Sequence, residues 1–278
     1  MTVRGHVHRG GFVKFGILGT YVILPGQNYC INAPKQRNLM AVLTVNGNVL
    51  IPVERLAREV WPDEPPASAS NLIRQYVFRL RRSLPPSVGR AIVTGPGGYK
   101  LRLARGDVDS HLFDANVVRG RAAFAAGRLD EAVRALSEAL AAWRGDPLAD
   151  VDPSPSILAE TRRLGERRLL AIEMRADAYL RLGWYDEAVE ELAALVTLHP
   201  ERERLRDMQM RALCQVGRRA DALAVYRDLR QTLADGVGIE PGPELQRLHR
   251  QVLDGDPALS EPPVRRSAVA GWSGSAYR

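Results

Sequence analysis

The stretch that decides the fold is SASNLIRQYVFRLRRS, residues 68–83. At about 100° per residue, a helix over these residues turns one apolar face toward a core, made by Ile73, Val77, Leu80 and Leu84. The other face carries amide and basic side chains around one aromatic ring: Asn71, Arg74, Gln75, Phe78, Arg79, Arg81 and Arg82. Such donors on an exposed helix face are typical of a recognition helix in the DNA major groove. A solvated amphipathic helix that only keeps the protein soluble is the alternative interpretation.

The distribution of charge favours the first interpretation. Residues 1–105 carry a formal net charge of +11, whereas residues 106–255 carry −5. Concentrated positive charge is what phosphate neutralisation and counterion release require. Arginine content alone is not evidence, because 36 of the 39 basic residues are arginine, as a GC-rich genome would produce.

Length and composition indicate a globular protein of about two domains, with 278 residues of which 45% are hydrophobic. No apolar run approaches the roughly 20 residues that cross a bilayer, and the first residues lack the apolar core of a signal peptide. We therefore expect a cytoplasmic, nucleoid-associated protein. Cys30 and Cys214 fall in different expected domains, so neither a disulfide framework nor a cysteine zinc site is expected, and no metal or cofactor is predicted.

The residues before the recognition helix predict a small sheet and two further helices. Short apolar stretches separated by turns, one of them at Pro25-Gly26, predict an antiparallel sheet over residues 12–31. A first helix should begin at Pro34. After a brief extended stretch over residues 49–51, a second should begin at Pro52 and end at Trp61-Pro62.

The residues after the recognition helix, AIVTGPGGYKLRL at 91–103, predict a β-hairpin. Sheet, three helices and hairpin together form a winged helix-turn-helix, with the hairpin as the wing. Tyr99 should face inward, while Lys100 and Arg102 face outward, where they can meet DNA phosphates. The glycine-rich turn could also suggest a phosphate-cradling loop, but no helix and no Lys-Ser/Thr pair follow it.

The second module repeats one pattern three times, in the segments that begin AAGRLDEA at residue 125, LRLGWYDEA at 180 and CQVGRRADA at 214. In each, a glycine precedes an alanine by five residues and a bulky apolar residue by nine: Gly127, Ala132 and Leu136; Gly183, Ala188 and Leu192; Gly217, Ala222 and Tyr226. The last two glycines are 34 residues apart, which is the tetratricopeptide period, and an insertion over residues 144–157 separates the first two. We expect an all-α tetratricopeptide-like domain whose last helix begins near Pro243.

Nothing in the chain predicts an enzyme. The five histidines lack metal-ligand spacing and have no evident nucleophile beside them. Acidic pairs such as Asp186-Glu187 fall at expected helix starts, where the helix dipole favours them.

Seven segments, in order, resemble the Streptomyces antibiotic regulatory proteins (SARPs), transcriptional activators of secondary-metabolite gene clusters. The segments are KFGILG (14–19), PKQRNLMAVL (34–43), LAREVWPDEPPASASN (56–71), YVFRLRRSL (76–84), GYKLRL (98–103), ALAAWRGDPLAD (139–150) and GIEPGPELQRLH (238–249). The resemblance covers about residues 13–259. It implies an OmpR-type winged-helix DNA-binding domain over residues 12–105 and a bacterial transcriptional activation domain over residues 106–255, between a flexible start (1–11) and a disordered tail (256–278).

The resemblance also implies a homodimer or tandem pair on direct repeats near promoter −35 elements, and recruitment of RNA polymerase holoenzyme including sigma. Taken with the helix-face argument, the expected DNA contacts are Lys35, Arg37, Ser70, Asn71, Arg74, Gln75, Phe78, Arg79, Arg81, Arg82, Thr94, Gly98, Tyr99, Lys100 and Arg102. In the loop over residues 61–67, the candidate polymerase contacts are Trp61, Asp63 and Glu64.

Two features depart from the SARP pattern. Arg74 stands where relatives usually carry glutamine or another neutral residue, and the wing reads GPGGY where theirs reads RPPGY. The operator sequence therefore does not transfer. The sequence also lacks the ATPase and sensor extensions of larger relatives, so control by abundance or by an unidentified ligand is expected.

The prediction is a sequence-specific DNA-binding activator. The alternative is a tetratricopeptide-type interaction module, or a repressor, with only non-specific affinity for nucleic acid.

Overall fold

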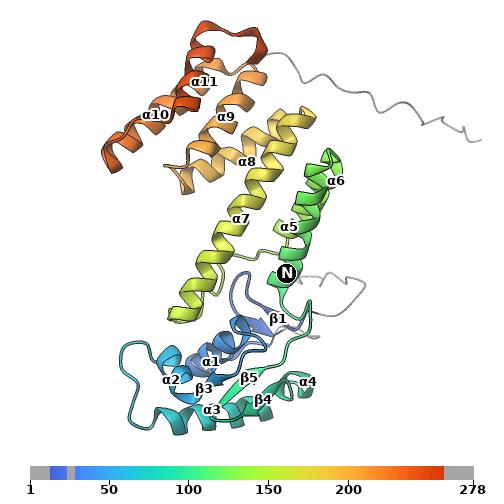
Figure 1. Ribbon diagram of the computed structural model, residues 1–278, viewed down its shortest axis with the longest axis vertical. Helices are drawn as coiled ribbons and strands as arrows, with labels where there is room; N and C mark the ends of the chain where they lie inside the picture. Colours follow the sequence, from blue (N-terminus) through green and yellow to red (C-terminus); the bar gives the residue numbers. More distant parts are fainter. Residues whose placement is uncertain (1–12, 24–28, 260–278) are drawn as a thin grey trace, which may run out of the picture. The chain divides into compact units, whose positions relative to one another are not determined.

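The computed structural model of the chain describes residues 13–23 and 29–259 (Figure 1). The expectations for residues 1–11, for the Pro25-Gly26 turn and for the tail from residue 260 lie outside the described residues. By their contacts, the residues form two compact units. Unit 1 comprises residues 1–125 and 134–172, and unit 2 comprises residues 126–133 and 173–278.

Unit 1 begins with the expected small sheet, in which β1 (Phe15–Gly16) pairs antiparallel with β2 (Val22–Ile23). Helix α1 (Pro34–Val45) begins at the expected proline, which has no N–H and so removes one of the donors that lack a partner in the first turn. The extended stretch that follows is β3 (Ile51–Pro52), and α2 runs over Val53–Val60. Pro52 thus lies in the strand, one residue before the helix, because it pairs with Gly98.

The recognition helix is α3 (Ala69–Ser83), as expected. A short helix that the sequence analysis missed, α4 (Pro86–Gly89), follows it. Four residues are too few to show an apolar period, although the proline start was a signal. The hairpin consists of β4 (Ile92–Gly95) and β5 (Gly98–Leu101), and β3 joins it to give an antiparallel sheet of order β3-β5-β4.

The three helices α1, α2 and α3 pack on one another, and α1 also packs on β5. Their shared core is fully buried and includes Leu39, Leu43, Leu56, Ile73, Leu80 and Leu101. This is the winged helix that the sequence predicts, because the apolar face of α3 meets the two preceding helices.

The rest of the described chain is helical: α5 (Asp109–Ala125), α6 (Leu129–Leu140), α7 (Pro155–Leu182), α8 (Tyr185–Leu198), α9 (Glu203–Gln215), α10 (Arg219–Val237), α11 (Pro243–Asp254) and a 3-10 turn η1 (Pro257–Leu259). In unit 2, α8 packs on α9, which packs on α10 and α11. No helix within the described ranges is long and apolar enough to cross a membrane.

The repeat glycines have one structural role. Gly127, Gly183 and Gly217 have φ of 72°, 78° and 77°, the left-handed conformation that ends a helix and that side chains with a Cβ disfavour. The alanine five residues after each is fully buried, which permits the close helix packing that the pattern predicts.

Within unit 1, two later segments, residues 107–109 and 144–150, bond to the first sheet and to the residues between its strands. The carboxylate of Asp109 accepts hydrogen bonds from the backbone N–H groups of Ile17 and Leu18, at 2.8 and 3.2 Å. Burial raises the pKa of Asp109, while these bonds and Arg144 oppose the rise. In the expected insertion, the N–H of Arg144 donates to the carbonyl oxygen of Leu18, and that of Leu148 to those of Ile17 and Gly19, so the insertion bonds to the same segment. The boundary between the two expected domains, after residue 105, stays a prediction.

Candidate nucleic-acid interface

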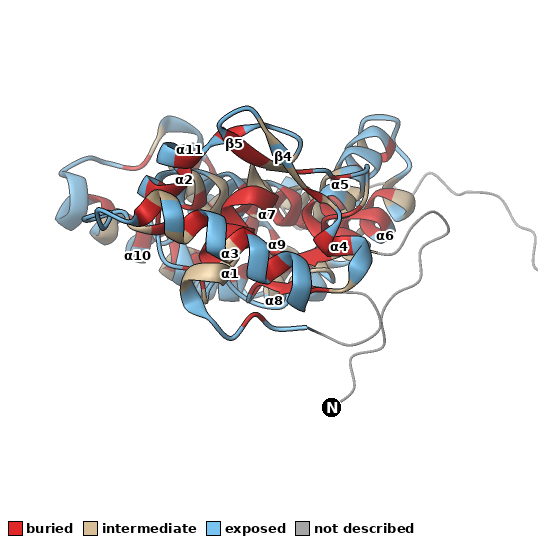
Figure 2. Ribbon diagram, turned by 90° about the horizontal axis from the view of Figure 1, so that it is seen from below, coloured by how far each residue is buried: buried red, intermediate tan, exposed pale blue. Residues whose placement is uncertain are grey.

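Helix α3 has the two faces that its sequence predicts. Ile73, Val77 and Leu80 are at most 1% exposed. The side chains expected to reach DNA from the opposite face are all exposed except Ser70, which is half-buried: Asn71, Arg74, Gln75, Phe78, Arg79, Arg81 and Arg82. In Figure 2 the exposed and buried residues alternate along α3 accordingly. Phe78 is 60% exposed and lies among these donors.

Two contacts on α3 order its exposed donors. Nη1 of Arg74 donates a hydrogen bond of 2.9 Å to Oδ1 of Asn71, one turn earlier. The guanidinium of Arg82 lies over the ring of Phe78, with its Cζ 5.5 Å from the ring centroid. An amide and guanidinium pair near the helix start can present several donors to purine edges, which accept such bonds.

The wing presents only part of its surface to solvent. Tyr99 and Leu101 are buried, whereas Arg102 is exposed and Lys100 is half-buried, which confirms the expected alternation. Gly98 is also buried, and a Cβ there would meet the carbonyl oxygen of Ile51 at 2.2 Å. Gly98 and Tyr99 thus hold the hairpin on β3, while Thr94 remains exposed beside its tip.

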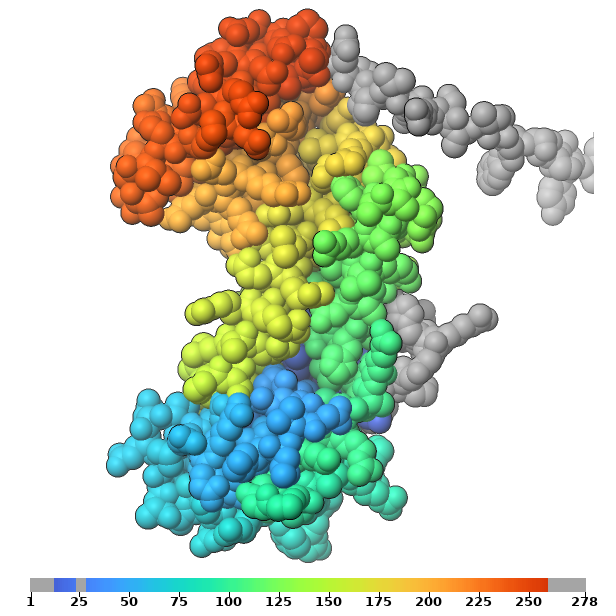
Figure 3. All heavy atoms as spheres, viewed as in Figure 1, coloured from blue at the N-terminus to red at the C-terminus, as the bar shows by residue number. Residues whose placement is uncertain are grey.

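Arg81 bonds to the wing as well as lying on the exposed side of α3. Its Nε and Nη2 donate hydrogen bonds to the carbonyl oxygen of Ile92, and Nη2 also donates to Oγ1 of Thr94. In Figure 3 the atoms of α3 and of the wing, cyan to green, form one continuous surface. Helix and wing therefore make one candidate interface.

This surface is free of acidic residues, a signal that the sequence analysis did not use. Between Glu64 and Asp107 the chain contains no Asp or Glu and eight basic residues: Arg74, Arg79, Arg81, Arg82, Arg90, Lys100, Arg102 and Arg105. Arg90 was not among the expected contacts, yet it is exposed and lines, with Arg81 and Arg82, a hollow of about 380 Å³ beside α4. An uncompensated cluster of guanidinium groups attracts phosphate.

Lys35 and Arg37, also expected to meet DNA, bind elsewhere in unit 1. Nζ of Lys35 lies 3.0 Å from Oδ2 of Asp152 and donates to the carbonyl oxygen of Val60. Arg37 donates to the backbone oxygens of Asp150 and Ile31. The hydrogen bonds from Lys35 and Asn38 lower the pKa of Asp152. Whether either cation also reaches phosphate stays a prediction.

The candidate polymerase loop is anchored at its first residue. The ring of Trp61 stacks on that of Tyr76 of α3, with 6.0 Å between centroids, while Asp63 and Glu64 are exposed. The loop therefore begins against the recognition helix and presents acidic groups to solvent.

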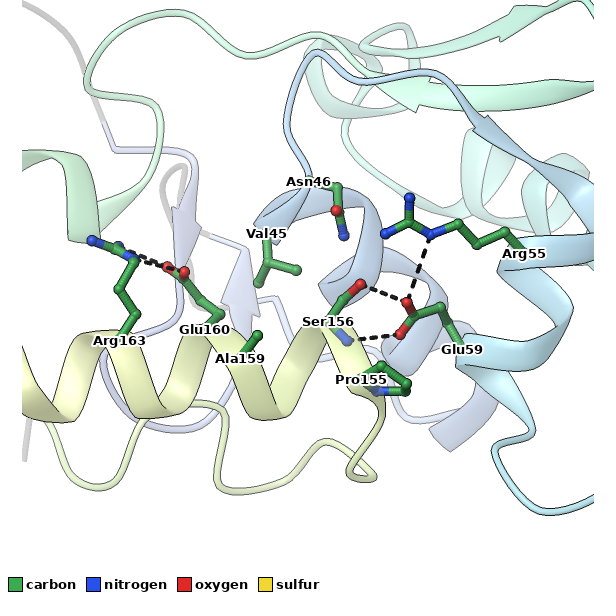
Figure 4. A pocket seen from close by; sticks show the side chains of 9 residues that line it. All are labelled: Val45, Asn46, Arg55, Glu59, Pro155, Ser156, Ala159, Glu160 and Arg163. Atoms are coloured by element: carbon green, nitrogen blue, oxygen red, sulfur yellow. Dashed lines mark hydrogen bonds and ion pairs between the residues drawn. The ribbon is translucent and has the colours of Figure 1, made fainter.

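A second hollow, of about 400 Å³, lies between the end of α1, α2 and the first turns of α7 (Figure 4). At its edge the carboxylate of Glu59 points at the start of α7, where it accepts bonds from the hydroxyls of Ser154 and Ser156 and from the Ser156 N–H. Arg55 lies 3.9 Å away from Glu59, and Arg163 binds Glu160. Its lining charges balance, so this hollow does not resemble an anion site. No group of residues that could hold a metal occurs within the described ranges.

Comparison with known families matches two models to the chain. Residues 30–101 match the family described as transcriptional regulatory protein, C terminal, and residues 108–253 match the bacterial transcriptional activator domain. Together these matches span the winged helix and most of the helical remainder.

Several curated proteins are similar to the chain. Regulatory protein AfsR of Streptomyces coelicolor is 41% identical over 253 residues, which are 90% of this chain and 25% of AfsR. The chain thus spans about a quarter of that relative. Regulatory protein DnrI of Streptomyces peucetius is 35% identical, over 82% of this chain and 86% of DnrI. Transcriptional regulatory protein EmbR of Mycobacterium tuberculosis is 34% identical, over 92% of this chain and 67% of EmbR.

A solved structure is also similar, that of Mycobacterium tuberculosis EmbR in complex with a low-affinity phosphopeptide. The TM-score is 0.79 at 34% sequence identity, over 87% of this chain and 65% of that one.

Proposed function

Because the chain belongs to the SARP family of transcriptional regulators, we propose that it is a sequence-specific DNA-binding activator of an antibiotic biosynthetic gene cluster. It binds promoter DNA through α3 and the wing, as a homodimer or tandem pair on direct repeats near a −35 element. It then recruits RNA polymerase holoenzyme, including sigma, and the loop over residues 61–67 is the candidate contact. Such an activator acts in the cytoplasm, at the nucleoid.

The observation that carries the proposal is the exposed face of α3. Its guanidinium and amide donors surround Phe78, and no acid occurs between Glu64 and Asp107 to neutralise them. A face that served only solubility would gain nothing from an aromatic ring that is 60% exposed. Against DNA, the ring can contact a thymine methyl group while the donors bind purine edges and phosphates.

Footprinting tests the proposal. The purified protein is bound at near-physiological salt to promoter fragments from its own gene neighbourhood, beside scrambled fragments of equal length. We expect two protected blocks on one face of the duplex near a −35 element, spaced by about one helical turn (10–10.5 bp) or a multiple.

Activation is tested separately, by transcription from a protected promoter with purified polymerase holoenzyme. We expect more transcript when the protein is added, because a bound activator recruits polymerase, and less transcript would identify a repressor. Uniform weak protection that disappears as salt rises would support the interaction-module alternative instead.

A further inference from the structure

We propose that Arg81 is a positioning residue, which holds the wing at a set angle to the recognition helix so that both contact one DNA duplex together. This inference rests on the proposed function. It assigns Arg81 a task different from that of its exposed neighbours on α3.

The geometry begins with the direction of the Arg81 side chain. Nε and Nη2 donate hydrogen bonds to the carbonyl oxygen of Ile92, at 3.2 and 2.9 Å, and Nη2 donates a third, of 2.8 Å, to Oγ1 of Thr94. The Cζ atom also lies 5.8 Å from the centroid of the Tyr99 ring. One guanidinium group therefore contacts both strands of the wing, β4 through Ile92 and Thr94 and β5 through Tyr99.

The acceptor at Ile92 needs a partner. In the sheet order β3-β5-β4, strand β4 lies at an edge. The carbonyl of Ala91 bonds to the N–H of Arg102, so the next carbonyl, that of Ile92, points away from β5. Edge carbonyls without a partner favour unwanted strand pairing or need another donor. Arg81 supplies that donor from α3.

The backbone of α3 is held at the same place. A Cβ added to Gly89 would lie 2.7 Å from the carbonyl oxygen of Arg81, so α4 packs directly on the end of the recognition helix. Arg81 is thus fixed at both its backbone and its side chain. Neighbouring Arg82 differs, because its guanidinium lies over Phe78 of the same helix.

The substitution Arg81→Lys separates the effect of the positive charge at this position from the effect of the hydrogen bonds to the wing. Lysine keeps the positive charge that a phosphate contact needs, but it lacks the planar fork that reaches Ile92 and Thr94 together. Arg82→Lys is the matched control, one residue away with the same chemical change. Each is combined with Lys100→Ala, which removes a wing cation, and the salt dependence of binding to a footprinted promoter fragment is measured for every variant.

In the parent protein, Lys100→Ala should lower the slope of log affinity against log salt by about 0.9, the value for one lost phosphate contact. We expect the slope change to fall below half of that in the Arg81→Lys background, because the wing is no longer held against the duplex. In the Arg82→Lys background it should stay at about 0.9.

An undiminished effect of Lys100→Ala in the Arg81→Lys background would overturn the positioning role. If wild-type protein showed no preference for promoter over random DNA, the proposed function would fail instead, a result visible before any variant is made. The single variants Lys100→Ala and Arg102→Ala are also compared with the wild-type protein. If neither changed the slope of log affinity against log salt, the wing would not contact DNA, and the positioning role would be wrong. Should Arg81→Lys not fold, as judged by circular dichroism, Arg81→Gln takes its place with Arg82→Gln as its control, because both lose the same charge and only the first loses the fork that bonds to Ile92 and Thr94.

Discussion

The basic side chains of unit 1 differ in the hydrogen-bond and ion-pair partners that they have within the protein. Arg74 is exposed on α3 and bonds only locally, to Asn71. Lys35, by contrast, is held by a carboxylate and a carbonyl of its own unit. A basic side chain of unit 1 can therefore stay available for the proposed DNA contact or stabilise the fold, and only its partners distinguish the two cases.

Arg74→Ala should weaken binding to the operator by about 1–3 kcal/mol and alter the preferred base at one position, because a bidentate contact to a base edge is lost. Competition binding against a library of operator variants measures both effects. Equal loss on operator and random DNA would contradict a role in base reading.

Lys35→Ala should leave the salt slope of DNA binding unchanged, because its Nζ already binds Asp152 and the carbonyl oxygen of Val60. The phosphate contact expected from sequence would instead lower the slope by about 0.9. Titration with promoter DNA at several salt concentrations shows whether the slope is unchanged or lowered. Lys100→Ala is the positive control, because it should lower the slope.

At the scale of elements, α2 is joined to α7 by one carboxylate. Glu59 is 5% exposed and accepts bonds from Ser154 and from both the N–H and the hydroxyl of Ser156. The first N–H groups of a helix have no partner within it, so Glu59 provides a cap from another element. The second helix of the winged domain thereby stabilises the start of a 28-residue helix.

Glu59→Ala should lower the free energy of unfolding by roughly 1–3 kcal/mol, because it leaves buried donors without an acceptor. Urea denaturation followed by circular dichroism measures the change. Glu54→Ala is the matched control, an exposed acid on the same helix, and should change stability by no more than about 0.5 kcal/mol. Similar losses for the two variants would show that the cap contributes nothing.

At the scale of the whole molecule, unit 1 joins segments that the sequence assigns to two domains. The backbone of residues 17–21 is paired mainly by later residues: Asp109 with Ile17 and Leu18, Leu148 with Ile17 and Gly19, and Asp150 with Tyr21. Buried backbone groups without partners are costly. The winged helix therefore depends on residues 107–109 and 144–150 for part of its own hydrogen bonding.

A fragment of residues 1–172 should unfold cooperatively, whereas a fragment of residues 1–105 should be markedly less stable. The shorter fragment lacks Asp109, Leu148 and Asp150, which pair with the first sheet. Thermal unfolding of both fragments, monitored by circular dichroism, measures the difference. Equal midpoints would show that the winged helix folds independently of the later segment.

Local patterns were enough to predict most elements and the candidate face of α3. Apolar residues at helical spacing indicate α3 and its buried side, and glycines 34 residues apart indicate helix ends, since both features depend on near neighbours. The short α4 was missed because four residues carry no period. Arg90 was missed because its place beside Arg81 and Arg82 depends on the turn that α4 makes.

The sequence by itself determined the longer helices of the winged domain, the buried face of α3, the hairpin, the concentration of positive charge and the family. Only the tertiary structure decided which basic side chains remain available for a DNA contact and which are held by other residues. Lys35 meets Asp152, 117 residues away, and Arg81 reaches the wing, 11 and 13 residues away. Periodicity follows from the repeat of one helix or strand, whereas a partner for a charge comes from whichever segment the fold brings beside it.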